Sequence, residues 1–482
     1  MTRILLLSTA ALGLVALTPA AQACTLSALS LTCADGTTST NQRWDQNGLT
    51  ILVESGATVS STGAATPAFR FGGNDITLTN DGLIQNPNTA DNNANNAIEV
   101  RGTNQTYINN GTISGGDRGI HSRGGDGGLT VINAESALIE SRRQTVRGGE
   151  DYPGTTVIND GVIRSTEGRA LQIRGQGSTV INNGALYGGE EVVEARDDFT
   201  IINNGLIQFD ESVADQDGVQ FASGRAENYG RIVGTDDAID LDEGEVYNAP
   251  GAVLLSLGPD DDPNKAAIDM DGEFDNSRDP LRPAGSVRIV NEGYMEGPRA
   301  ISAAYDPSLP DDHVSQARQS VEIVNSGTML GRSGIAIGLA PTQGDSSLTL
   351  LGDSRILGDV LFGAGDDLLS IDTLTSDLLI DGLFDGGAGE NTVSLVAYML
   401  TDVLGFEAAG DGSYMLRLTG AAGELAGGFR NWQSWLFADG SRLSTAEFAA
   451  ALAPAPVPLP AGLPLLLAGL AGLGALRLRA RG

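Results

Sequence analysis

The chain has 482 residues, with 65 glycines, 5% aromatic residues, and 29 basic against 61 acidic residues for a net charge of −32. A charge of this sign disfavours nucleic acid as a partner, because that affinity comes largely from neutralising phosphates. A hydrophobic content of 41% is too high for a fully disordered chain, and the glycines follow no Gly-X-Y period, which excludes collagen.

Residues 1–23 have the pattern of a secretory signal peptide. Arg3 precedes an apolar run from Ile4 to Leu17, and Ala21-Gln22-Ala23 matches a small-x-small cleavage pattern. The run is short for a membrane span. We therefore expect the Sec export machinery to carry the chain across the membrane and residues 1–23 to be removed. A short membrane anchor is the alternative.

Cys24 and Cys33 are the only cysteines of the chain. Two nearby cysteines in an exported protein most simply form a local disulfide. We predict that these two pair and fasten an N-terminal cap over residues 24–44. Cleavage of the signal peptide would leave Cys24 as the first residue, so a lipid-modified cysteine is the alternative, although the preceding residues lack the usual leucine.

A short pattern, apolar-Asn-x-Gly-x-apolar, recurs through residues 45–394. A second unit lies between its copies and alternates apolar and polar residues, as in Ala97–Gly102 and Ala170–Gly175. Alternation with period 2 predicts half-buried strands, and the Asn-Gly and Asp-Gly steps predict corners with positive φ. The asparagines of the copies are Asn80, Asn109, Asn133, Asn159, Asn182, Asn203, Asn228, Asn248, Asn291 and Asn325.

These repeats predict an all-β fold, a single-stranded right-handed parallel β-helix. Three short strands fit in each repeat, and the coils of such a solenoid stack about 4.8 Å apart. The repeated asparagines are expected to form a hydrogen-bonded ladder, with ligand contact by the same side chains as the alternative. The array resembles the passenger regions of autotransporters and the haemagglutinin-like adhesins, which implies an adhesin-like surface protein.

The second repeat unit places charged residues at matching outward positions. The candidates for a glycan-facing column are Glu99, Arg101, His121, Arg123, Arg174 and Arg196. Acidic residues follow further along the chain, and carboxylates bind hard cations such as calcium. The candidates for this metal site are Asp240, Asp242, Asp269 and Asp271. A solvated face with weak ion pairs is the alternative for both groups.

A polysaccharide lyase or hydrolase is the main alternative function, because lyases on this fold use an acidic cluster for calcium and an arginine as base. Here the arginines and the aspartates lie on different repeats, and His121 and His313 are the only histidines. No serine elbow, histidine-metal spacing or nucleotide fingerprint occurs in the sequence. We therefore predict that the protein is not an enzyme.

Two later stretches resemble the calcium-binding nonapeptide Gly-Gly-x-Gly-x-Asp-x-apolar-x. They are Phe362–Ser370, which contains Asp366 and Asp367, and Gly386–Ser394, which has Asn391 in place of the aspartate. Calcium in such a roll needs tandem copies, and these copies are 24 residues apart. The resemblance makes calcium the one candidate cofactor, and ordinary solenoid corners are the alternative.

Residues 395–453 are rich in aromatic rings in a chain that is otherwise poor in them. The open end of a parallel solenoid has to be covered. We therefore predict a C-terminal cap with a helix near its end, and a sugar-stacking platform is the alternative. The rings are Phe429, Trp432, Trp435, Phe437 and Phe448.

The last segment, residues 454–482, has three parts. The motif Val457-Pro458-Leu459-Pro460-Ala461 is followed by an apolar stretch from Gly462 to Leu476 and by Arg477, Arg479 and Arg481. This segment resembles the VPLPA-CTERM sorting domain of Gram-negative bacteria, of the PEP-CTERM class handled by exosortases. The resemblance implies a transmembrane helix, a transient stay in the inner membrane, and cleavage near the motif by a membrane-embedded thiol transpeptidase. A plain membrane anchor is the alternative.

Together these patterns predict an exported, non-enzymatic surface or extracellular-matrix protein. Its expected partners are the export machinery, an exosortase-type enzyme, and exopolysaccharide or cell-surface glycans, and the sorting-domain resemblance implies association with biofilm. A structural surface component without a specific ligand is the second alternative, after the lyase or hydrolase.

Overall fold

The computed structural model describes residues 24–453, except for 37, 91–93, 150–151, 210–214, 263, 271–284, 304–319, 341, 373–377 and 421–422. Strands dominate these residues, and the described helices are one short α-helix and one 3-10 turn, Leu400–Asp402. The all-β prediction is therefore confirmed. The predicted signal peptide and sorting tail lie outside the described residues, within which no helix is long and apolar enough to cross a bilayer.

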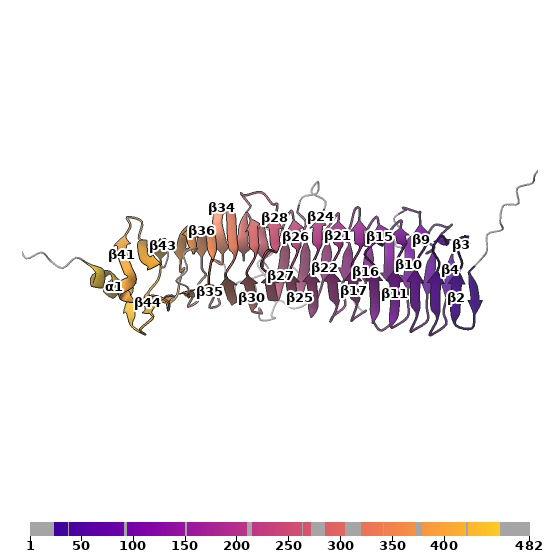
Figure 1. Ribbon diagram of the computed structural model, residues 1–482, viewed down its shortest axis with the longest axis horizontal. Helices are drawn as coiled ribbons and strands as arrows, with labels where there is room; N and C mark the ends of the chain where they lie inside the picture. The colour runs from indigo at the N-terminus through magenta and orange to yellow at the C-terminus, as the bar shows by residue number, and fades with distance from the viewer. Residues whose placement is uncertain are drawn as a thin grey trace, which may run out of the picture.

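The strands form three columns that run along a rod, shown in Figure 1 with its N-terminal end in indigo and its C-terminal end in yellow. Within each column, the strands of successive coils pair in parallel and in register. The chain passes from the first column to the second and third before it returns to the first. This architecture is a parallel β-solenoid, as the repeats predict.

The first column contains β2 (Ser30–Cys33), β5 (Thr50–Val53), β8 (Thr77–Asn80), β11 (Gln105–Asn109), β14 (Leu129–Asn133), β17 (Thr156–Asn159), β20 (Thr179–Asn182), β23 (Phe199–Asn203), the ends of β25 (Val219–Asn228) and β27 (Ile239–Asn248), β30 (Val287–Asn291), β33 (Val321–Asn325), β35 (Ser347–Leu350), β37 (Leu368–Ile371) and β40 (Thr392–Leu395). The second contains β3 (Thr38–Thr40), β6 (Thr58–Ser60), β9 (Leu83–Asn86), β12 (Thr112–Gly115), β15 (Leu138–Ser141), β18 (Val162–Ser165), β21 (Ala185–Gly188), β24 (Leu206–Phe209), β26 (Arg231–Gly234), β28 (Val253–Ser256), β31 (Tyr294–Gly297), the starts of β34 (Thr328–Gly338) and β36 (Arg355–Leu361), and β38 (Leu379–Asp381). The third contains β4 (Gln42–Trp44), β7 (Phe69–Phe71), β10 (Asn96–Val100), β13 (Arg118–Ser122), β16 (Val146–Gly148), β19 (Leu171–Ile173), β22 (Val193–Ala195), the starts of β25 and β27, β29 (Ala266–Asp269), β32 (Arg299–Ser302), the ends of β34 and β36, and β39 (Leu383–Asp385).

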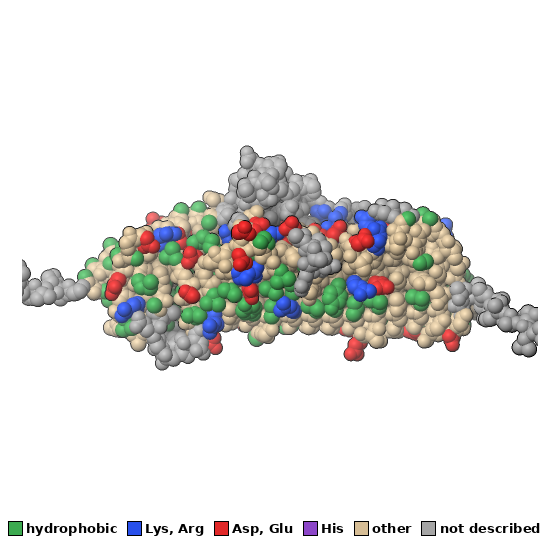
Figure 2. All heavy atoms as spheres, turned by 90° about the horizontal axis from the view of Figure 1, so that it is seen from above, with side chains coloured by type: hydrophobic (Ala, Val, Ile, Leu, Met, Phe, Trp, Pro, Cys, Tyr) green, Lys and Arg blue, Asp and Glu red, His purple; other side chains and the backbone are tan. Residues whose placement is uncertain are grey.

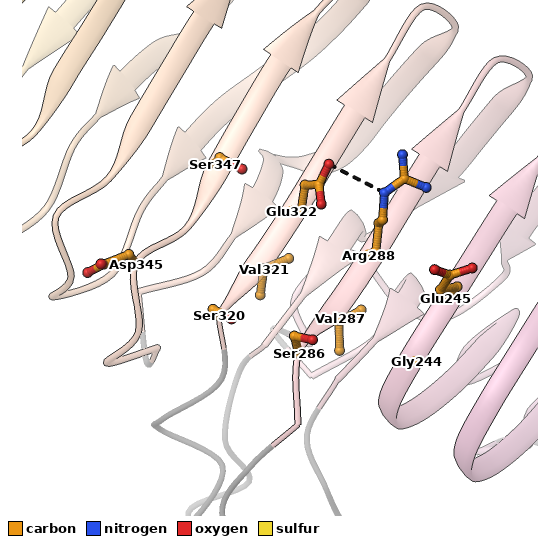
Figure 3. Close-up of a pocket in the computed structure, with 10 residues that line it drawn as sticks. All are labelled: Gly244, Glu245, Ser286, Val287, Arg288, Ser320, Val321, Glu322, Asp345 and Ser347. Carbon is orange, nitrogen blue, oxygen red and sulfur yellow. Dashed lines mark ion pairs between the residues drawn. The ribbon is translucent and has the colours of Figure 1, made fainter. Parts of the chain in front are cut away.

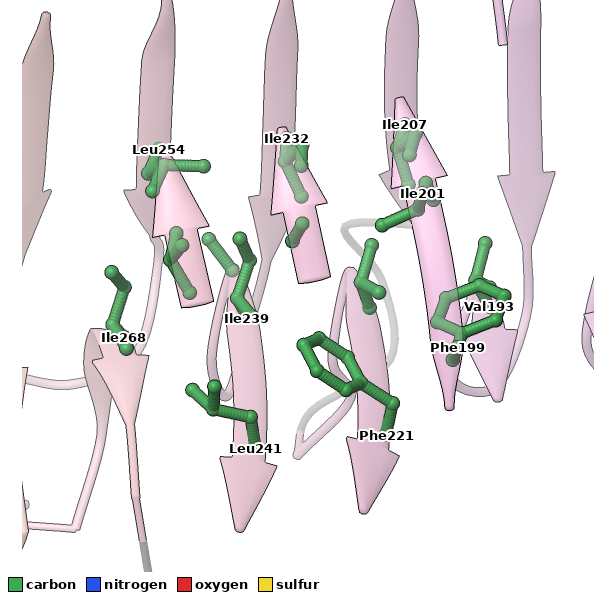
Figure 4. Close-up of a cluster of buried hydrophobic side chains, with 14 of the residues drawn as sticks. Val193, Phe199, Ile201, Ile207, Phe221, Ile232, Ile239, Leu241, Leu254 and Ile268 are labelled. Carbon is green, nitrogen blue, oxygen red and sulfur yellow. The ribbon is translucent and has the colours of Figure 1, made fainter. Parts of the chain in front are cut away.

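Alternate side chains of each strand point into the rod. In β20, Val180 and Asn182 are buried, while Thr179 and Ile181 are half-buried on the outer face. Val180 stands in register with its counterparts on the coils before and after it, so like residues stack along the core. Figure 4 shows this stack in the middle of the rod, where Phe199 and Phe221 pack with ring centroids 5.8 Å apart.

The repeated asparagines form the predicted ladder inside the first column. Each is fully buried, and each Nδ2 donates to the Oδ1 of the next asparagine at 2.8–2.9 Å, from Asn80 without a break to Asn325. The same Nδ2 often donates to a backbone carbonyl of the next coil, as Asn159 does to Ala185 at 3.1 Å. Their complete burial excludes these side chains from ligand contact.

In the copies that have a glycine two residues after the asparagine, this glycine is needed for close packing rather than for positive φ. A Cβ atom at Gly184 would lie 2.0 Å from the carbonyl oxygen of Gly161 on the preceding coil. The glycines of these Asn-x-Gly copies are absent from the described glycines with positive φ, so the expectation of left-handed corners was wrong for them. It holds for the variant copy at Asn248, where Gly251 has a φ of 80°. The coils approach so closely at this corner that no side chain fits there.

The N-terminal end of the rod is closed by β1 (Thr25–Ser27), which pairs antiparallel with β2. Cys24 and Cys33 form the predicted disulfide, and Cys33 is fully buried in the first coil. The cross-link therefore ties the start of the described chain to the first strand of the solenoid core.

The C-terminal end is covered by an antiparallel sheet and a helix. The ends of β43 and β44 pair in parallel with β39 and β40 and so continue the third and first columns. The aromatic side chains expected to form the cap are all buried, and Phe406, Trp435 and Phe448 pack with centroids 4.3–5.1 Å apart. These buried rings do not form a sugar-stacking platform. The elements of the cap are β41 (Val403–Ala408), β42 (Tyr414–Gly420), β43 (Gly423–Arg430), β44 (Ser434–Phe437), β45 (Arg442–Ser444) and α1 (Thr445–Leu452).

The asparagine ladder predicts that alanine substitution at two adjacent asparagines, Asn182 and Asn183, changes the free energy of unfolding by very different amounts. Asn182→Ala removes the acceptor of Asn159 and the donor to Asn203, so it should lower the free energy of unfolding by about 2–5 kcal/mol. Asn183→Ala removes only exposed hydrogen bonds, such as that to Asp160, and should cost less than about 1 kcal/mol. Urea unfolding followed by circular dichroism measures both values, and equal losses would contradict a stabilising ladder.

Candidate functional site

The third column carries one polar side chain per coil on its outer face, and we call this line of residues the third-face row. Its N-terminal part is rich in arginine, and its C-terminal part is acidic. Figure 2 shows arginine and acidic side chains in small mixed groups on one side of the rod. In register, the row consists of Arg43, Arg70, Glu99, His121, Arg147, Gln172, Glu194, Gln220, Asp240, Asp269 and Ser302.

Glu99 is the first buried carboxylate of the row, and three guanidinium groups surround it. Arg101 Nε lies 2.6 Å from Glu99 Oε1, and Arg70 and Arg123 each approach the carboxylate at 3.5 Å. The structure thus brings together the predicted Glu99, Arg101 and Arg123. One negative charge is shared by three positive charges, so this part of the row remains basic.

Glu194 is the second buried carboxylate of the row. Arg169 Nε, Arg174 Nε and Gln172 Nε2 each lie 2.6 Å from one of its oxygens. Burial opposes the ionisation of Glu194, but Arg169 and the hydrogen bonds from Arg174 and Gln172 outweigh burial and hold its pKa below the ordinary value. The predicted Arg174 therefore belongs to this group, and Arg196 follows it one coil further along.

His121 and Arg147 lie between these two carboxylates. His121 is buried, and burial followed by the charges of Arg118 and Arg147 lowers its pKa to about 2. Its imidazole is therefore neutral at physiological pH. It can donate and accept hydrogen bonds, but it cannot form an ion pair. Burial, followed by repulsion from Arg174, also lowers the pKa of Arg147.

The sequence analysis missed three arginines of this region, Arg70, Arg147 and Arg169. Arg147 lies in Thr145-Val146-Arg147-Gly148, a copy of the second repeat unit at the expected position after Gly119–Gly124. Counting one such unit per coil would have found it. Arg169 lies before the third-column strand rather than in it, so only the folded structure places it beside Glu194.

The acidic part of the row contains two of the predicted metal ligands side by side. Asp240 and Asp269 are buried, in register on adjacent coils, and Gln220 Nε2 donates to Asp240 Oδ2 at 2.9 Å. Asp242 follows on the same strand, β27, two residues beyond Asp240. Asp271 lies outside the described residues.

A neighbouring group of acids was not predicted. Asp217, Asp236 and Asp237 each offer one carboxylate oxygen, and these oxygens lie within 4.8 Å of one another. Burial, followed by repulsion from Asp269, raises the pKa of Asp237 well above its ordinary value. Lys265, the only lysine of the chain, places its Nζ 3.1 Å from Asp236. The carboxylates suit calcium chemically, but the lysine already neutralises part of their charge, and bound calcium stays a prediction.

The two glycine-rich stretches form stacked corners. Asp366 is exposed and accepts a hydrogen bond from the Glu390 N–H at 2.8 Å. Asp367 is buried, and its Oδ1 accepts from the Ser346 N–H at 2.7 Å. In the next coil, Asn391 occupies the position of Asp367 and accepts from the Asp367 N–H. These side chains bond backbone groups of adjacent coils, which favours ordinary corners over a calcium roll.

A hollow of about 350 Å³ lies on the outer face of the first column in the C-terminal half of the rod (Figure 3). Arg288 Nε and Glu322 Oε1 form an ion pair at 3.3 Å within it. Glu245 and Asp345 also line the hollow, so acids outnumber the arginine. A small uncharged or cationic ligand suits this lining better than an anion does.

The N-terminal half of the same face carries no charge over eight coils, and we call it the hydroxyl face. Because each ladder asparagine points inward, the residue before it points outward. One line of outward residues is Ser30, Thr50, Thr77, Thr106, Thr130, Thr156, Thr179 and Thr200. The parallel line is Thr32, Leu52, Thr79, Ile108, Ile132, Ile158, Ile181 and Ile202.

No family model matches the sequence, and neither a curated protein nor a solved structure is significantly similar to it.

Asp367 predicts a measurable dependence of stability on pH. Burial, opposed by the Ser346 N–H and increased by Asp345, raises its pKa to about 7. An unfolded aspartate has a pKa of about 3.9, so the free energy of unfolding should fall between about pH 4 and pH 7 and then level off. Asp367→Asn should remove this fall and be roughly 1–4 kcal/mol more stable than the unmodified protein above pH 7.

Urea unfolding at pH 4, 6, 7 and 8 measures this profile. Asp366→Asn, in the exposed neighbour, is the control and should leave the profile unchanged. If the free energy of unfolding falls with pH equally in Asp367→Asn and in the unmodified protein, the pKa of Asp367 is not raised and the prediction is wrong.

Proposed function

We propose that the protein is exported, sorted through its C-terminal segment by an exosortase-type enzyme, and displayed as an adhesin-like rod at the cell surface or in the extracellular matrix. The observation that carries this proposal is the parallel solenoid of the described residues, which lies in the sequence between a signal-type segment and a sorting-type segment. A rod of this kind fills its interior with its own side chains and presents long faces to the outside. The disulfide at its N-terminal end suits an oxidising compartment.

The position of the charged groups supports a binding role over catalysis. Arg147 and Asp240 are separated by four steps of the third-face row, which is about 19 Å at the spacing of stacked strands. Arg147 and Asp240 at this separation could not act as base and calcium ligand on the same sugar unit. The neutral, buried His121 also has no hydrogen-bonded carboxylate among the described residues, and its partner is the Asn96 amide. A polysaccharide lyase or hydrolase remains the alternative.

The sorting proposal is tested at the C-terminus of the mature protein. Mass spectrometry of protein released from the cell surface should find a C-terminus near Val457–Ala461 and no peptide containing Arg477 to Gly482. Replacement of Pro458 and Pro460 by alanine should leave the uncut chain in the membrane fraction. A surface protein that retains Arg477 to Gly482 would contradict cleavage and favour a plain membrane anchor.

The lyase alternative makes a different forecast. Incubation of the purified protein and calcium with acidic glycans would raise the ultraviolet absorbance, because lyases leave an unsaturated sugar. We expect no rise and no new reducing ends across a panel of acidic and neutral polysaccharides. Calcium-dependent cleavage of any of them would replace the adhesin proposal with the enzymatic one.

A second candidate function rests on the hydroxyl face. Its side chains repeat about every 4.8 Å along the rod and about every 7 Å along each strand, which makes a periodic array of hydroxyl and methyl groups. The outward lines hold neither aromatic rings for sugar stacking nor charges for an ionic ligand. Such an array could order water in the pattern of a crystal, and we propose ice as its ligand.

Ice binding is measured as thermal hysteresis and as retention of the protein in slowly grown ice. Replacement of Thr156 and Thr179 by tyrosine should abolish both, because the rings interrupt the periodic array. The same pair of substitutions at the charged end of this face, at Glu245 and Glu322, should have no effect. Absence of hysteresis in the unmodified protein, or binding to crystalline cellulose instead, would overturn this second candidate.

A further inference from the structure

We infer that Arg147, with His121 and Gln172 on the adjacent coils, forms a binding site for the carboxylate-bearing unit of an acidic polysaccharide. This inference deepens the proposed adhesin-like function by naming the chemical class of its ligand. The three residues are consecutive in the third-face row, so they lie along the rod axis on one line.

Arg147 differs from the arginines around it because no described carboxylate pairs with it directly, although the charge of Glu194 acts on it from beyond contact distance. Arg101 and Arg123 share Glu99, and Arg169 and Arg174 share Glu194. Among the described residues, the Arg147 guanidinium has neither a hydrogen bond nor an ion pair, although it is half-buried. A half-buried arginine without a direct ion pair can accept the carboxylate of a ligand as its partner.

Gln172 supplies a second unsatisfied group beside it. Its side chain is only 4% exposed, and its Nε2 donates to Glu194 Oε2 at 2.6 Å. Because the carboxylate must accept, this contact identifies the other amide atom as oxygen. Within the described part of the chain, Oε1 is buried and has no donor. A buried acceptor without a donor is costly, and a ligand hydroxyl would satisfy it.

The combination of an arginine and an amide acceptor identifies the ligand class. A guanidinium binds a carboxylate with two parallel hydrogen bonds, and an amide oxygen accepts from a hydroxyl. A sugar acid carries both groups on one ring, whereas a simple carboxylate such as acetate offers no hydroxyl and a neutral sugar offers no charge. His121 lies on the opposite side of Arg147 from Gln172. Its neutral imidazole adds a further hydrogen-bonding group there.

The row also favours a linear polymer over a single sugar. Neighbouring coils continue the same outward line, with Glu99 and its arginines on one side of Arg147 and Glu194 and its arginines on the other. The chain as a whole carries a net charge of −32 and repels polyanions in general. Binding should therefore depend on this one local group of arginines rather than on the overall charge.

The test uses isothermal titration of the purified protein with three hexamers: oligogalacturonate, the mannuronate oligomer of alginate, and uncharged cellohexaose. We expect saturable binding of at least one acidic hexamer and none of cellohexaose. Arg147→Gln should weaken this binding at least tenfold, Arg147→Lys should weaken it less because the charge remains, and Gln172→Met should weaken it severalfold.

Arg164→Gln is the matched control, because it removes the same charge from the second column. Arg164 is 48% exposed and pairs with Glu140 at 2.6 Å, away from the third-face row. This control should bind as the unmodified protein does. Equal weakening by Arg147→Gln and Arg164→Gln, or no saturable binding of either acidic hexamer, would overturn the inference.

Thermal unfolding of every variant separates binding from folding, and Arg147→Lys and Gln172→Met decide the outcome if Arg147→Gln does not fold. Failure of this test leaves the sorting proposal intact, because sorting is read at the C-terminus of the mature chain. Conversely, a chain that keeps its tail can still bind the acidic hexamer.

Discussion

The fold depends on a line of asparagines whose amide groups are bonded only to one another and to the backbone. An unpaired buried amide costs about 1–3 kcal/mol, so the asparagines between the two ends of the line are tolerated only because the coils on both sides of them supply partners. A strand shifted by one residue would turn its asparagine outward and break two hydrogen bonds at once. The ladder therefore sets both the register of each coil and its distance from the next.

This constraint acts on the inside of the rod and leaves the outside free to vary. The outward residue before each asparagine is isoleucine in coil after coil of the N-terminal half, yet it becomes Glu227 and Tyr247 further along without any change in the ladder. The third face changes in the same way from arginine to aspartate. A solenoid can thus carry several different surfaces on one repeated core, which suits a protein that works by display.

Much of this architecture could be predicted from the repeats, because the asparagine of each repeat and the close-packed glycine of most repeats reveal where the coils meet. The burial of the ladder and the ring-filled cap follow from the same reasoning. Arg169 beside Glu194, and Asp217 beside Asp236 and Asp237, could not be predicted, because these contacts join corners of different coils. The reason for the motif glycines was also mistaken, since packing against Gly161, and not positive φ, excludes a side chain at Gly184.

The central claim is that the asparagine ladder holds the solenoid together, and hydrogen exchange of the unmodified protein tests it most directly. The ladder ends at Asn325, where Leu350 occupies the next position in register. The account predicts slow amide exchange in the first-column strands from β8 to β33 and measurably faster exchange in β35 and β37, which have the same apolar core without the ladder. Uniform protection across this boundary, or faster exchange on the ladder side, would contradict the account.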